Sequence, residues 1–175
     1  MEKRRIVLPE IEQYYSGSLH KDIPEYKTIR IAHAIVTKGG YTLRMSGFPA
    51  IGPDGIIGKG NMRVQTLQAL DYVKRTVEAG GATWDDVVHM TFFFTDREKF
   101  HREAVPARVE FFGKHAKSGA LPCITSIGVS ALMHPDMLIE VEATAVWDNK
   151  PARRSRVAAK TSTRSRTTRP ARLGR

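Results

Sequence analysis

The sequence contains a single cysteine, Cys123, no apolar run long enough to span a bilayer, and no acidic residue between positions 151 and 175. One cysteine excludes an intramolecular disulfide and a cysteine-rich metal site, and it suits a reducing compartment. A membrane helix needs about 18 or more consecutive apolar residues, so a membrane-spanning helix is not expected. The charged first residues lack the apolar core of a secretory signal. We therefore expect a cytoplasmic protein.

The formal net charge of +10 is unevenly distributed over the 175 residues. Residues 151–175 hold eight arginines and one lysine, whereas residues 1–150 hold 19 basic and 18 acidic side chains. The tail has no aromatic residue and few large aliphatic ones, so apolar burial cannot offset the entropy of ordering it. We expect residues 150–175 to form a disordered, Arg-rich tail. Its simpler interpretation is a solubilising extension; the alternative is weak, salt-sensitive contact with a polyanion such as a nucleic acid.

Turn residues and apolar patterns divide the rest of the chain into an arm and a body. Residues 1–30 show no clear period and predict an irregular N-terminal arm, and residues 31–149 predict one folded domain. The apolar segments on either side of Gly39-Gly40 predict a β-hairpin. The expected elements are strands at 34–37, 41–46, 87–94, 124–131 and 138–147, with helices at 61–79 and 96–115.

Capping residues mark the ends of both expected helices. Asn61 can cap the first helix, and Gly80-Gly81 can end it. Asp96 can cap the second helix, in which Pro106 indicates a start or a break. The first helix is expected to bury one apolar stripe, formed by Val64, Leu67, Leu70, Val73 and Val77.

This order of elements predicts an α+β fold in which two helices cover one face of a sheet. The segment 87–94 is apolar on both sides, because Met90 and Phe92 alternate with Val87 and Phe93. If helices cover only one face of the sheet, the apolar side chains on the other face of this strand are exposed to water. Burial against another subunit removes that cost, so we expect an oligomer.

An ordered set of motifs between about residues 32 and 147 resembles the RidA/YjgF family. The motifs are Ser46-Gly47-Phe48-Pro49, the helix segment 65–70, the strand 86–96, Leu121-Pro122-Cys123-Ile124-Thr125 and Glu140-Val141-Glu142-Ala143. The resemblance implies a chorismate-mutase-like fold with a mostly antiparallel sheet, assembled as a homotrimeric barrel with clefts between subunits. Deaminase members of the family hydrolyse reactive enamines and imines there, without a metal or an organic cofactor.

The resemblance also implies which residues form the cleft. The glutamate that positions the attacking water falls on Glu140, although an ordinary surface carboxylate is the alternative. The arginine that holds the substrate carboxylate is replaced by Ile124, which makes this a non-standard member, and Phe48 replaces a glutamine. Arg44, Arg108 or a neighbouring subunit is expected to supply the missing cation. The residues expected to bind substrate are His33, Ser46, Gly47, Phe48, Cys123 and Ile124.

Three functions follow as hypotheses. The first is a Rid-type hydrolase that deaminates an enamine or imine, such as an aminomuconate-like compound. The second is a non-catalytic trimer that binds a small metabolite, and the third is an RNA-associated protein that uses the basic tail. Cys123 is interpreted as a buried structural cysteine and His89 as a packed or surface histidine. No spacing of His, Cys, Asp or Glu is typical of a metal site.

Overall fold

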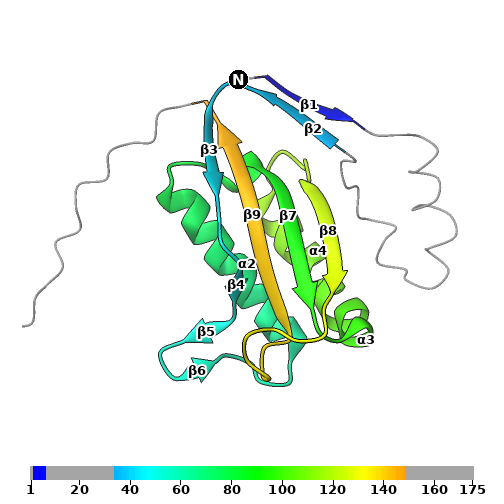
Figure 1. The fold of residues 1–175 in the computed structure, drawn as a ribbon. Helices are drawn as coiled ribbons and strands as arrows, with labels where there is room; N and C mark the ends of the chain where they lie inside the picture. The colour runs from blue at the N-terminus through cyan, green and yellow to red at the C-terminus, as the bar shows by residue number, and fades with distance from the viewer. Residues whose placement is uncertain (1, 7–33, 149–175) are drawn as a thin grey trace, which may run out of the picture.

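The computed structural model describes residues 2–6 and 34–148 of the chain (Figure 1). His33, the remainder of the expected arm and the expected basic tail lie outside the described residues. Within them, the strands are β1 (Glu2–Ile6), β2 (Ala34–Lys38), β3 (Tyr41–Arg44), β4 (Phe48–Pro49), β5 (Ile51–Gly52), β6 (Gly55–Ile56), β7 (Val87–Phe94), β8 (Cys123–Gly128) and β9 (Ile139–Trp147). The α-helices are α2 (Met62–Ala79), α3 (Arg97–Lys99) and α4 (Val105–His115).

The main sheet has the strand order β3-β9-β7-β8, and β4 pairs with β9 beyond the end of β3. Strands β7 and β8 run parallel, whereas β9 is antiparallel to β3, β4 and β7. Both long helices, α2 and α4, lie behind this sheet in Figure 1. The expected α+β fold, with a mostly antiparallel sheet and two helices on one face, is therefore confirmed.

The helix boundaries follow from the capping residues. The Asn61 side chain accepts a hydrogen bond from the backbone N–H of Val64, and the Asp96 side chain accepts one from Lys99. Gly81 has a φ of 88°, a left-handed conformation that favours glycine after a helix. Between α3 and α4 the chain forms a π-helical segment, Phe100–Ala104, and Pro106 lies in the first turn of α4. The break predicted near Pro106 is thus confirmed.

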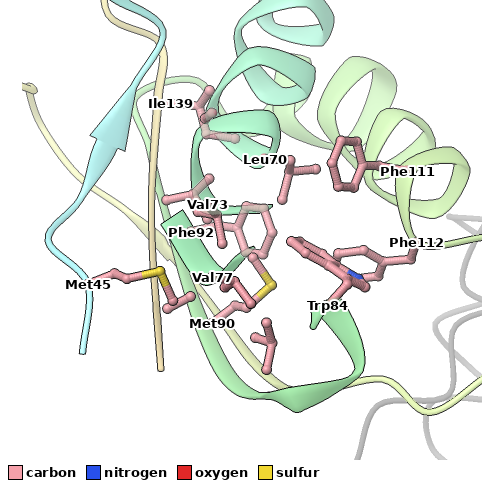
Figure 2. Packing of buried hydrophobic residues seen from close by; sticks show 14 of the residues in the cluster. Met45, Leu70, Val73, Val77, Trp84, Met90, Phe92, Phe111, Phe112 and Ile139 are labelled. Atoms are coloured by element: carbon pink, nitrogen blue, oxygen red, sulfur yellow. The ribbon is translucent and has the colours of Figure 1, made fainter. Parts of the chain in front are cut away.

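The hydrophobic core lies between the sheet and the two long helices. Figure 2 shows Leu70, Val73 and Val77 of α2 directed toward Phe92 and Met90 of β7, and these five side chains are fully buried. Trp84 lies in a single 3-10 turn before β7, and its ring centroid is 5.1 Å from that of Phe111 and 5.6 Å from that of Phe112. Alternate residues of β7 and β9 face this core, so the intervening ones lie on the sheet face away from α2 and α4. That second face is called the open face below.

Two expectations about local structure are wrong. The hairpin does not form, because β2 pairs with β1 and β3 pairs with β9, although Gly39 and Gly40 both adopt the left-handed turn conformation. Val64 is 38% exposed instead of lying on the buried stripe of α2. Both errors concern partners that are distant in the sequence, which a local pattern does not specify.

The N-terminal arm also differs from expectation where the structure describes it. Residues 2–6 form the regular strand β1, which pairs antiparallel with β2 from Glu2 opposite Lys38 to Ile6 opposite Ala34. The expectation of an irregular arm is therefore wrong for these residues. None of the helices among the described residues combines the length and apolarity required to cross a bilayer.

Candidate functional site

The carboxylate of Glu140 lies directly against Gly47. Glu140 is the second residue of β9 and is opposite Pro49 of β4. A Cβ atom at position 47 would lie only 1.8 Å from Oε1 of Glu140, so any residue larger than glycine would displace the carboxylate. Ser46, the preceding residue, is exposed. The structure therefore brings together two of the expected site residues, Gly47 and Glu140, and Ser46 directly precedes Gly47 in the chain.

A β-bulge produces this contact. Arg44 is opposite Thr144, and Phe48 is opposite Val141, so the edge segment has one more residue than the matching part of β9. An extra residue in one strand bends it locally and redirects its side chains, and such bulges are common beside active sites. Here the bulge includes Gly47, whose missing side chain leaves the space that the Glu140 carboxylate occupies.

Glu140 shares the open face with other polar residues of β9. Glu142 and Thr144 follow it at the period of two that places side chains on one face of a strand. Beside them is a cavity of about 200 Å³. It is lined by Arg44, Met45, His89, Glu142, Ala143 and Thr144.

Arg44 is the positively charged group of this cavity. It is exposed at the end of β3, and it forms no ion pair with any carboxylate of the described residues. Arg108, the other arginine considered for this role, is only 2% exposed. Its guanidinium carbon lies 5.1 Å from the ring centroid of Phe92 and 6.0 Å from that of Phe100, in the core behind the sheet. Of these two arginines, only Arg44 is available to a ligand on the open face.

Ile124 and Phe48 lie on the helix side of the sheet. Ile124 is opposite Met90 of β7 and packs against the hydrophobic core. Phe48 also packs against that core, and its ring centroid is 6.3 Å from that of Tyr72 in α2. Both are therefore separated from Glu140 by the sheet. Within one chain, the structure does not bring these two expected substrate-binding residues together with Glu140.

Cys123 has a neighbour that sequence reasoning missed. It begins β8 and is opposite His89 of β7, so the thiol and the imidazole lie on the open face in adjacent strands. Cys123, interpreted from the sequence as a buried structural cysteine, is half-buried in the structure. Because 34 positions of sequence separate the pair, only the parallel β7–β8 register reveals it. Among the described residues there is no group of three or more His, Cys, Asp or Glu side chains able to hold a metal ion.

The comparisons with known proteins agree with this architecture. A family model described as Endoribonuclease L-PSP matches residues 19–147, which is most of the chain. The chain belongs to this family, also known as RidA/YjgF. A RutC family protein from Pyrococcus horikoshii is 34% identical over 109 residues, which are 62% of this chain and 81% of the relative.

Solved structures show the same fold. The Rid family protein YyfB from Yersinia pestis has a TM-score of 0.65 and 27% identity, over 84% of this chain and 100% of YyfB. TdcF from Escherichia coli, crystallised with bound serine, has a TM-score of 0.56 and 27% identity, over 65% of this chain and 85% of TdcF.

Gln65 is a further residue of this Rid protein that positions the site. Its side chain is fully buried in α2. Its amide nitrogen donates hydrogen bonds to the carbonyl oxygens of Asp136 (2.7 Å) and Gly58 (3.3 Å), and its amide oxygen accepts one from the N–H of Leu138 (2.8 Å). These bonds hold the loop that leads into β9 one residue before the strand begins. In the sequence, the position of Gln65 beside the apolar residues of the expected helix could have indicated that this polar side chain is buried.

An ion pair supports the same loop. The Lys59 ammonium is 2.9 Å from the Asp136 carboxylate, and its hydrogen bond holds the pKa of that carboxyl below its ordinary value. Both side chains are more than a third exposed, so the contact contributes little to stability.

Proposed function

We propose that the chain is a hydrolase that releases ammonia from a reactive enamine or imine, with Glu140 activating the attacking water. The observation that carries the proposal is the position of the Glu140 carboxylate, which packs directly against Gly47, the residue after the exposed Ser46. Membership of the RidA/YjgF family supports the reaction class.

The reaction needs one group that accepts and returns a proton. An enamine first becomes the imine by transfer of a proton from nitrogen to carbon. Water then adds to the carbon of the C=N bond while Glu140 accepts one of its protons, and the nitrogen gains a proton to become an amine. Collapse of this intermediate forms a C=O bond and releases ammonia. A carboxylate within hydrogen-bond reach of the water can perform both transfers as general base and then general acid.

Arg44 supplies the positive charge in this proposal. It lies on the same sheet face as Glu142 and Thr144, has no ion-pair partner among the described carboxylates, and lines the open cavity. A guanidinium binds a carboxylate through two parallel N–H bonds, so a substrate with a carboxylate group fits this side of the site. The serine bound to TdcF supports a ligand of the size and charge of a small amino acid.

A trimer completes the site in this proposal. The open face is covered by neither α2 nor α4 in Figure 1, and it carries the half-buried Phe93 and the 40% exposed Ile127 beside the polar residues. A second copy packed against this face would exclude water and close the cleft over Glu140.

The test is an ammonia-release assay with a panel of enamines and imines, which includes small amino-acid imines and an aminomuconate-like compound. We expect Glu140→Gln and Glu140→Ala to lower kcat/KM by about 100-fold or more, because general acid–base catalysis contributes at least that much. The control is Glu98→Gln, which changes an exposed carboxylate on α3 and should leave the rate unchanged. Absence of turnover with every compound, or full activity of both Glu140 variants, would contradict the proposal.

A second candidate is a non-catalytic trimer that binds a small metabolite. Ile124 favours it, because an apolar side chain occupies the position of the family's carboxylate-binding arginine and packs into the core. In that case, the same compounds bind in a calorimetric titration but are recovered unchanged.

A further inference from the structure

A second cavity lies on the helix side of β4, away from Glu140. It has a volume of about 460 Å³ and is formed between β4 and the outer surface of α2. Pockets that bind small molecules measure about 300–1,000 Å³, a range that includes this cavity but not the 200 Å³ cavity of the open face. The residues that line it are Phe48, Tyr72, Arg75, Thr76, Glu78 and Ala79.

Two aromatic rings form one corner of this cavity. The ring planes of Phe48 and Tyr72 meet at 50°, with their centroids 6.3 Å apart. The pairing of β4 with β9 fixes the backbone of Phe48, and the Tyr72 hydroxyl donates a hydrogen bond to the carbonyl oxygen of Ile51. Because both rings are held at their positions, the corner exists before any ligand arrives. A planar ring can pack against it in the tilted or offset geometry that aromatic groups prefer.

The charged group best placed to bind a ligand in this cavity is Arg75. Its guanidinium carbon is 5.8 Å from the centroid of the Tyr72 ring. Its contact with Asp71 is long, 3.8 Å, and both side chains are largely exposed, so the pair is weak. The Glu78 carboxylate, by contrast, is 2.8 Å from the Lys74 ammonium, which offsets its charge. Of the two charged side chains that line the cavity, Arg75 therefore has the weaker ion pair. Its positive charge favours an anionic ligand.

From these observations we propose that the cavity binds a small planar aromatic carboxylate. The ligand's ring packs against Phe48 and Tyr72, and its carboxylate accepts hydrogen bonds from the Arg75 guanidinium. Of the residues expected from the sequence to bind substrate, only Phe48 lines this cavity, and Glu140 and Arg44 lie on the other side of the sheet. It is thus a second binding site, independent of the proposed function.

The test compares two probes of the same shape, 2-naphthoate and 2-naphthylmethanol, in fluorescence titrations of the full chain. We expect 2-naphthoate to bind about fivefold more tightly, because a charge-assisted hydrogen bond at an exposed site contributes about 1 kcal/mol. Arg75→Gln should abolish this difference while the affinity for the neutral probe stays the same. Equal affinities of the wild type for the two probes, or absence of saturable binding, would overturn the proposal.

Two further variants separate the roles of charge and ring. Arg63→Gln removes an arginine from the same helix outside the cavity, where it pairs with Glu110, and should leave both affinities unchanged. Phe48→Leu keeps an apolar residue against the core but removes one ring, and should weaken both probes to a similar degree. A loss of 2-naphthoate affinity in Arg63→Gln equal to that in Arg75→Gln would show a nonspecific charge effect and overturn the site. Ammonia release, in contrast, should be unchanged in Arg75→Gln.

Discussion

The contact between Gly47 and Glu140 shows how one missing side chain determines the position of a functional group. Oε1, Cδ and Cγ of Glu140 would all lie within 3 Å of a Cβ atom at position 47. The whole side chain, and not only its tip, occupies the space that the glycine leaves free. At the residue scale, the candidate site therefore depends on position 47 as much as on the carboxylate itself.

We expect Gly47→Ala to lower kcat/KM about as much as Glu140→Gln, because the carboxylate must leave its position. The overlap between the alanine Cβ and the Glu140 side chain should also lower the free energy of unfolding by about 1 kcal/mol. This is the lower end of the range for overpacking, because Glu140 is only half-buried and its side chain can move. A double-mutant cycle with Glu140→Ala checks the reason. The stability cost of Gly47→Ala should nearly disappear in the Glu140→Ala background, and an unchanged cost would refute the steric explanation.

At the scale of elements, β9 organises the sheet and carries the site. It pairs with β3, β4 and β7, and its alternation separates the core residues Ile139, Val141 and Ala143 from the open-face carboxylates. The start of β9 is held by the buried Gln65 of α2. Helix α2 therefore positions Glu140 through the hydrogen bonds of the Gln65 amide as well as through apolar packing.

Gln65→Leu should destabilise the fold by about 2–4 kcal/mol in urea unfolding. It removes the three hydrogen bonds of the amide and leaves the carbonyl of Asp136 and the N–H of Leu138 without this partner. The matched control is Gln68→Leu, a half-buried position on the same helix, for which we expect a change below about 1 kcal/mol. Similar losses in both variants would show that the hydrogen bonds of Gln65 have no special role.

At the scale of the whole molecule, the sheet has one covered face and one open face. The β-bulge between Val87 and His89 shifts the alternation of β7, so that Val87 is buried and Phe93 is the large apolar residue of this strand on the open face. The open face is therefore more polar than the pattern of residues 87–94 suggests. Assembly would bury the candidate site together with Phe93 and Ile127.

Light scattering after size exclusion should give about three times the chain mass of 19.6 kDa at micromolar concentration. Ile127→Asp should shift the population toward one chain mass, because it places a charge in the expected interface opposite Phe93. Val64→Asp introduces the same charge at an exposed position of α2, on the helix side of the sheet, and serves as a control for net charge. A wild-type protein with the mass of one chain would contradict the trimer. An equal fall in the measured mass of both variants would contradict the assigned interface.

The sequence by itself determined the features that depend on neighbouring residues. Asn61, Asp96, Gly81 and Pro106 set helix ends because capping and φ preferences act within a few residues of the chain. The strands and the α+β order followed from apolar runs, and the ordered set of motifs between residues 32 and 147 carried the resemblance to the family.

Only the tertiary structure decided which strands pair and which side chains share a face. It joined β2 to β1, placed His89 beside Cys123, and directed Phe48 and Ile124 away from Glu140. The physical reason is that register depends on burying residues distant in sequence, and a shift of one residue moves every side chain to the other face. The resemblance to the RidA/YjgF family made Glu140 a candidate, but the β-bulge at Gly47 determined where its carboxylate lies.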